Sequence, residues 1–278
     1  MFHLQLRNEL WKLFGKKRTY IGFIMFLLAQ NGIILLYRFT HATRFMIRTL
    51  ENNGFDAARY ISILTVSTIM VTAMSYTLMP LYAALVGGDL VAKEAEDGTL
   101  RMILARPVTR FRLLLLKWAA GGVFSFILVF SLGVLGLLFT SFWFPWGHMF
   151  AVPPLLPFGV FDPARGLQCY SLGLVCMVPK ALTIMTLAFM FSCFNMKPAA
   201  ATILALSVLF ISNIIQDLPF FLDYRTYFIT YHMDIWREAV ADRVAWWKIG
   251  ESFSFLAAYN LSFLVVGATV FQMRDIKS

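Results

Sequence analysis

Long apolar runs alternate with short polar stretches along most of this 278-residue chain. Six runs are long enough, at roughly 20 residues or more, to cross a bilayer as helices. They cover residues 20–37, 60–86, 111–141, 169–194, 199–215 and 252–273. The pattern therefore predicts an all-α integral membrane protein with six transmembrane helices in a single domain.

The first 18 residues carry apolar side chains at helical spacing instead of one continuous apolar run. Leu6, Leu10 and Leu13 fall on one side of such a helix, and basic residues fall on the others. A helix of this kind lies in the membrane interface with its cations toward anionic lipid head groups. We expect residues 1–18 to form this interfacial amphipathic helix. We expect residues 20–37 to be the first span and not a cleaved signal peptide, because no small-residue cleavage site is evident.

The connections between the predicted spans differ in character. Residues 38–59 form a polar loop, and residues 142–168 combine aromatic side chains with five prolines, which favours an interfacial loop. Pro80 is expected to kink the second span near its end. The mixed-charge segment 217–251 is expected to form an outer-surface helix pair, with Asp234–Trp247 as its better helical part.

Composition and charge agree with a membrane protein. Hydrophobic residues make up 59% of the chain and charged residues 14%, which leaves too little polar surface to cover a soluble domain. The net charge of +9 does not indicate a nucleic-acid partner, because the basic residues stand beside apolar runs and form no run of their own. The larger share of Lys and Arg flanks the ends that include both termini. This bias predicts cytoplasmic termini.

The sequence carries none of the motifs that would make it an enzyme. Gly15-Lys16 is the only Gly-Lys pair; it lacks the glycine of a phosphate-binding loop and is followed by Lys17. No HExxH or GxSxG sequence occurs, and the cysteines form no CxxC pair. We therefore expect no catalytic residues, no metal site, and no cofactor bound by this chain.

One strongly polar island, Gly88–Arg110, separates the second and third predicted spans. Gly98 is a good stop for a helix that begins upstream, and Thr99 can cap a short second helix that ends before Pro107. Leu100 and Leu104 share one side of that short helix. The element is thus suited to lie on a partner by its apolar side.

The island also carries a family resemblance. The resemblance lies in the identity and spacing of thirteen residues in and just after the island. They are Glu94, Glu96, Gly98, Thr99, Leu100, Leu104, Arg106, Pro107, Val108, Arg110, Leu113, Leu114 and Lys117. The chain in this respect resembles the type-2 permeases of ATP-binding-cassette (ABC) transporters, in which this cytoplasmic segment is a coupling helix between spans two and three. The resemblance implies a multi-pass protein of the bacterial cytoplasmic membrane that pairs with a second permease chain. It also implies two copies of a separate ATPase subunit, which bind ATP and Mg.

The resemblance further implies which residues contact the ATPase. Glu94 and Glu96 are expected to pair with cations of the ATPase, and Leu100 and Leu104 to fill an apolar groove on it. The complete expected docking set is Glu94, Glu96, Gly98, Thr99, Leu100, Arg101, Leu104, Arg106 and Pro107. Lys117, near the start of the third span, is expected to reach back to the interface.

A few polar residues inside the predicted spans are candidates for a transport pathway. Lys180 either extends to the outer interface beside Pro179 or lines a route for an anionic or polar cargo. Gln30 and Asn31 either form interhelical hydrogen bonds or line that route, and the same alternatives hold for Asn213 and Asn260.

The functional expectation is the permease subunit of an ABC transporter that exports a lipophilic or amphipathic substrate. Two alternatives stay open at this point. The chain either transmits force to an envelope partner, as relatives implicated in metalloenzyme maturation or motility do, or acts as a secondary transporter without an ATPase.

Overall fold

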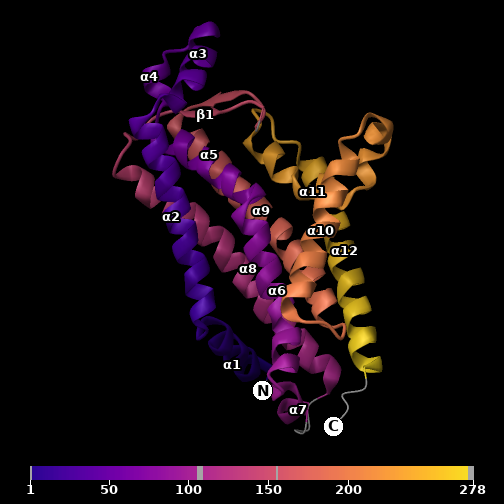
Figure 1. Ribbon diagram of the computed structural model, residues 1–278. Coiled ribbons are helices and arrows are strands. Elements are labelled where there is room, and N and C mark those ends of the chain that lie inside the picture. The colour runs from indigo at the N-terminus through magenta and orange to yellow at the C-terminus, as the bar shows by residue number, and fades with distance from the viewer. Residues whose placement is uncertain (1, 105–108, 155, 275–278) are drawn as a thin grey trace.

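The computed structural model describes residues 2–104, 109–154 and 156–274. Apart from one short hairpin, the elements in this part of the chain are helices (Figure 1). They are α1 (Phe2–Phe14), α2 (Lys17–Phe39), the 3₁₀ helix η1 (His41–Thr43), α3 (Arg44–Asn52), α4 (Ala57–Tyr60), α5 (Ile63–Tyr76), α6 (Leu78–Glu96), α7 (Thr99–Leu104), α8 (Arg110–Ser141), β1 (Met149–Ala151), β2 (Gly159–Phe161), α9 (Pro163–Ser192), α10 (Pro198–Gln216), the 3₁₀ helix η2 (Pro219–Tyr227), α11 (Ile229–Met233), the 3₁₀ helix η3 (Ile235–Val240) and α12 (Trp246–Met273).

Five helices in the described residues are long and apolar enough to cross a membrane. These are α2, α8, α9, α10 and α12, and their number is compatible with a multi-pass membrane protein. The predicted second span is instead divided between α5 and α6, which meet at a bend of 44°. The bend lies at Thr77, and Pro80 falls in the first turn of α6, where a proline is tolerated. The predicted kink at Pro80 is therefore displaced by three residues, and α6 runs on well past residue 86.

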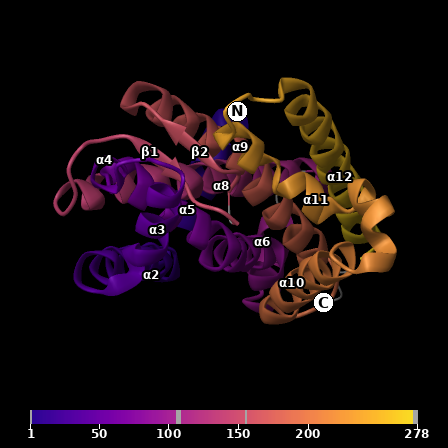
Figure 2. The same cartoon turned by 90° about the horizontal axis from the view of Figure 1, so that it is seen from above.

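Helix α9 lies at the centre of the bundle, packed against α6, α8, α10 and α12 (Figure 2). Within its most apolar window 67% of residues are buried, against 22% for α2 and for α12. Because most of its surface is covered by other helices, α9 buries hydroxyls as well as apolar groups. Thr183 and Thr186 both donate to carbonyls of the preceding turn.

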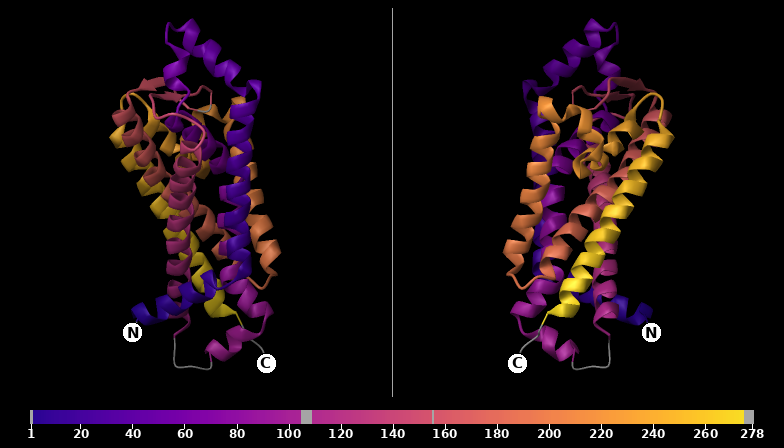
Figure 3. Two further views of the ribbon diagram at one scale, coloured as in Figure 1. Left: turned by 90° about the vertical axis from the view of Figure 1, so that its left-hand side faces the viewer. Right: turned by 90° about the vertical axis from the view of Figure 1, so that its right-hand side faces the viewer.

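The N-terminal helix, α7 and the end of α12 gather at one end of the bundle (Figure 3). Helix α1 runs across the bundle axis, as expected for an amphipathic helix, with Leu13 buried and Trp11 77% exposed. It ends at Phe14 and not at residue 18. Arg110 at the start of α8 donates to the carbonyl of Gln272 at the end of α12, which fastens these segments together.

The opposite end is capped by elements that the sequence reading placed in loops. Residues 44–52 form α3, which buries Met46 and Leu50 one turn apart. Within the predicted interfacial loop, β1 and β2 pair antiparallel, with Met149 opposite Phe161. The aromatic side chains there divide between a fully buried Phe150 and an exposed Trp146, so only some of them are placed as a membrane belt requires.

The segment before the last helix does not form an outer-surface helix pair: its first part, η2, is exposed, and its later part, η3, packs inward. It is built from η2, α11 and η3, and Trp236 is 1% exposed against α9. The predicted helix Asp234–Trp247 is wrong: η3 ends at Val240, and α12 already begins at Trp246. The charged residues that suggested a surface are therefore partly engaged inside the fold.

Candidate functional site

The polar island folds as a helix, a turn and a short second helix, as the sequence predicts. Helix α6 ends at Glu96, Gly98 adopts a φ of +72°, and α7 follows from Thr99. A positive φ is the conformation that favours glycine at the end of a helix. Thr109 accepts a hydrogen bond from the amide of Arg112 and caps α8. Thr99 differs from its expected role, because its hydroxyl donates to the carbonyl of Glu94 at 3.3 Å.

The short helix α7 turns its two sides to different surroundings. Leu100 is 3% exposed and belongs to the hydrophobic core of this chain, so it does not present itself to a partner as predicted. Met102 is 67% exposed. Leu104 stands one turn after Leu100 in this helix; its side chain, that of Arg101, and the whole of Arg106 and Pro107 lie outside the described residues. Among the α7 side chains that the structure describes, Met102 is thus the exposed apolar one.

A ring of four alternating charges joins three helices next to this turn. Lys117 of α8 places its Nζ 3.1 Å from Glu9 Oε2 and 2.7 Å from Glu94 Oε2. Lys12 of α1 places its Nζ 2.7 Å from Glu9 Oε1 and 3.7 Å from Glu94 Oε1. We call Glu9, Lys12, Glu94 and Lys117 the charge ring. It connects α1, the lower end of α6 and the start of α8.

The charge ring is shielded from solvent at its centre. The Lys117 side chain is 2% exposed, and those of Glu9 and Glu94 are 12% and 14% exposed. Burial opposes ionisation of Glu9, but the Lys117 and Lys12 ammonium groups outweigh it and lower the pKa of the carboxyl. Burial likewise opposes the charge on Lys12, and its contacts with Glu9 and Glu94 raise its pKa. Both groups are therefore held in their charged forms.

These contacts bear on two predictions. Lys117 is buried between two carboxylates, one of which is Glu9 of the amphipathic helix α1. Glu94 is engaged with Lys117 within this chain, and its contact with an ATPase stays a prediction. Glu96 is different: its carboxylate lies 2.9 Å from Lys93 at the surface, and contact of Glu96 with an ATPase stays a prediction.

The predicted pathway residues of the first span contact protein. Gln30 is fully buried and donates to the carbonyl of Leu132 in α8 at 2.9 Å, which is the interhelical bond expected for an amide in a span. Asn31 donates to the carbonyl of Leu27 in its own helix, and among the residues that the structure describes it forms no interhelical bond. Asn260 joins α12 to α9 through Thr183, whereas Asn213 accepts from Gln216 in its own helix.

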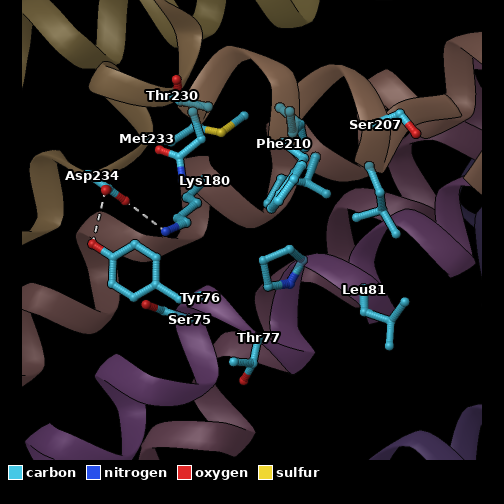
Figure 4. Close-up of a pocket in the computed structure, with 15 residues that line it drawn as sticks. Ser75, Tyr76, Thr77, Leu81, Lys180, Ser207, Phe210, Thr230, Met233 and Asp234 are labelled. Atoms are coloured by element: carbon cyan, nitrogen blue, oxygen red, sulfur yellow. Dashed lines mark hydrogen bonds and ion pairs between the residues drawn. The ribbon is translucent and has the colours of Figure 1, made fainter. Parts of the chain in front are cut away.

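Lys180 is the intramembrane charge that the structure places most informatively. It is 5% exposed and does not extend to an interface. Its Nζ lies 2.8 Å from Asp234 Oδ1 and 4.3 Å from the centroid of the Tyr76 ring. Tyr76 also donates to Asp234 Oδ2 at 2.9 Å (Figure 4). The three residues bring together α9, the turn after α11, and the end of α5 at the 44° bend.

Three residues of these two sites escaped the sequence reading. Glu9 and Asp234 each lie in a segment that was read as surface, and Tyr76 sits inside an apolar run. The sequence did contain one signal for these partners. Lys117 and Lys180 lie within apolar runs, where a buried lysine needs a carboxylate beside it. The sequence did not indicate which carboxylate, because the partners are far away along the chain.

The chain belongs to the family described as "Protein of unknown function (DUF2705)", which matches residues 20–277. Helix α1, and with it Glu9 and Lys12 of the charge ring, precedes the matched region. A search of curated proteins found no match. The family description names no activity.

Proposed function

We propose that this chain is the membrane-spanning permease subunit of an ABC transporter. In this proposal a separate ATPase, in two copies, hydrolyses ATP in the cytoplasm. Two permease chains pair in the membrane and couple this hydrolysis to the export of a lipophilic or amphipathic substrate. The proposal includes the bacterial cytoplasmic membrane as the location, with both termini in the cytoplasm.

The observation that supports the proposal most is the connection between α6, α7 and α8. Helix α6 begins at the bend in the bundle and runs without interruption to Glu96. It is followed at once by a short helix with one side in the core and Met102 outside. A force applied to α7 would pass along α6 to the bend, because an unbroken helix is stiff along its axis.

The charge ring adds a second route for that force. A displacement of α6 at Glu94 moves Lys117 on α8 and, through Glu9, moves α1. A buried pair resists separation, since a charge left without its partner in a nonpolar environment is strongly disfavoured. In this proposal the three helices therefore move as one unit when an ATPase displaces α7.

The variant Met102→Asp tests the proposal at its contact surface. Purified ATPase and permease are assembled in liposomes, and ATP hydrolysis is measured with and without the permease. We expect Met102→Asp to abolish most of the stimulation by the permease, because a carboxylate replaces an exposed apolar contact. Insertion and apparent Tm should be unchanged, since Met102 is 67% exposed.

Met273→Asp is the matched control. Met273 is also a methionine, is 85% exposed, and ends α12 at the same end of the bundle. Stimulation should persist in this variant. Equal loss in both variants, or normal stimulation by Met102→Asp, would contradict docking through α7.

A further inference from the structure

The ion pair between Lys180 and Asp234 at the α5–α6 bend borders a cavity. The cavity has a volume of about 550 Å³ and lies between the α5–α6 bend, α9, α10 and α11. Its volume is in the range of sites that hold small molecules. Figure 4 shows Lys180, Asp234 and Tyr76 together at one end of it, and Phe210 and Leu81 toward the other.

The cavity lies above the region where α6 packs closely against α9 and α10. Gly87 and Gly88 of α6 let that helix approach closely: a Cβ at Gly87 would overlap the carbonyl oxygen of Met185, and one at Gly88 would crowd Thr202 of α10. From this contact α5 and α10 diverge upward (Figure 1). Leu81 and Phe210 remain exposed at the rim, at 47% and 68%.

At the end of the cavity that holds Lys180 and Asp234, some hydrogen-bond donors and acceptors have no partner among the described residues. An ammonium group has three donors, and among the described residues Lys180 uses one, on Asp234 Oδ1. The two Asp234 oxygens accept from Lys180 and Tyr76, which leaves further lone pairs on the carboxylate. The hydroxyls of Ser75 and Thr230, which also line the cavity, are bonded to Thr72 and Gln216 within the protein. The ion pair is therefore the charged part of the lining that can bind a ligand's head.

The charges of the lining residues select the kind of head. Among the described residues that line the cavity, Lys180 and Asp234 are the charged ones, and their formal charges cancel. Asp234 would repel a head that is only anionic, and Lys180 would repel a head that is only cationic. A head with both signs supplies an anion to the lysine and a cation to the carboxylate.

We propose that this cavity binds a single-chain amphiphile with a zwitterionic head, placing the anionic group of the head on Lys180, its cationic group on Asp234, and its apolar chain between Leu81 and Phe210. The rim lets such a molecule enter sideways from a bilayer. As a binding site the cavity stands independently, and only its role as the site for exported cargo rests on the proposed function.

The test is a binding measurement on the full chain in nanodiscs of anionic phosphatidylglycerol. Tritiated lysophosphatidylcholine is the probe. Unlabelled lysophosphatidylcholine, lysophosphatidylglycerol and monoacylglycerol with the same acyl chain compete against it. We expect saturable binding that the zwitterionic competitor displaces about tenfold more effectively than the other two. Equal competition by all three would overturn the proposal.

Two variants test the location. Asp234→Asn leaves Lys180 as the only charged residue among those that line the cavity and should reverse the preference toward lysophosphatidylglycerol. Ser207→Trp narrows the exposed rim without altering the ion pair and should weaken binding about tenfold. Lys248→Met, a change at an exposed lysine on α12, should leave binding unchanged. If Asp234→Asn misfolds, Ser207→Trp decides, and undiminished binding by that variant would overturn the assignment.

The origin of the amphiphile is resolved by adding the ATPase and ATP. Release of the probe on hydrolysis identifies an exported cargo, and constant occupancy identifies a resident bilayer lipid. The binding assay needs no ATPase, so failure of the proposed function leaves the site standing. A working ATPase complex without zwitterion-selective binding overturns the site alone.

Discussion

At the scale of residues, the informative feature is that two lysines in apolar surroundings each have a carboxylate partner from a distant segment. Lys117 contacts Glu9 and Glu94, and Lys180 contacts Asp234. A sequence marks such lysines because an isolated buried charge is so unfavourable. It does not identify the partner, because α1 and the segment before α12 approach the lysines only after the bundle has formed. Sequence reasoning thus found the cations but did not predict that both are paired inside the fold.

The charge ring predicts an unequal response to two similar substitutions. Glu94→Gln leaves Lys117, which is 1% exposed, with one carboxylate instead of two. We expect it to lower the apparent Tm and to cost roughly 3 kcal/mol of unfolding free energy. Glu96→Gln removes only a surface pair with Lys93 and should cost less than about 1 kcal/mol. Thermal unfolding of the purified chain in detergent measures both.

Adding Lys117→Met to Glu94→Gln should recover most of the lost stability. The buried cation is then gone, and a side chain of similar length fills its place. No recovery in the double variant, or equal losses for Glu94→Gln and Glu96→Gln, would mean that the ring does not hold these helices together.

His232 predicts a pH dependence near neutrality. Its ring is stacked on Phe255, Nε2 donates to the carbonyl of Thr226, and Nδ1 accepts from Ser252. Burial lowers the pKa of His232 below its ordinary value of 6.5. The unfolded chain then binds a proton more readily than the folded one, so stability is fully present above that value and declines as the pH falls below it.

We expect the apparent Tm to fall between about pH 8 and about pH 5.5, and expect His232→Gln to reduce that slope. The exposed His3 provides the control, and His3→Gln should retain the slope. A slope that survives in His232→Gln would show that other groups control the pH response.

At the scale of elements, the sequence predicted five long helices but did not predict the bend between α5 and α6. Five apolar runs became single helices within a few residues of their predicted limits, because a run of about 20 apolar residues has few other structures open to it. The second run broke at Thr77, within the short polar stretch Ser75-Tyr76-Thr77, which was not recognised in the sequence as a break. Helix α3 was missed although Met46 and Leu50 stand one turn apart, because nine residues with three charges are too short and too polar to be taken for a span.

The glycine contact on α6 predicts a position-specific cost. Gly87→Ala places a Cβ where the carbonyl oxygen of Met185 lies, so one of the two helices must shift. We expect a loss of about 1–3 kcal/mol and a lower apparent Tm. Gly32→Ala in α2 adds the same atom where no neighbour lies within 4 Å and should be neutral or slightly stabilising. Equal behaviour of both variants would argue against close packing of α6 on α9.

At the scale of the whole molecule, the all-α bundle followed from the sequence, and the two sites followed only in part. The turn at Gly98 and the short helix after it were predicted correctly, because glycine and capping residues act locally. The orientation of α7 was not, since its apolar side packs Leu100 into the chain's own core. The cavity beside Lys180 had no signal in the sequence, because it depends on how far α5 and α10 diverge.

The central claim is that this chain works together with a separate ATPase. The direct measurement is the mass of the intact assembly, purified from its native membrane in mild detergent. The account predicts two permease chains, this one of 31.7 kDa and either a second copy or a related chain, together with two ATP-binding subunits. An assembly that contains this chain and no ATP-binding subunit would contradict it.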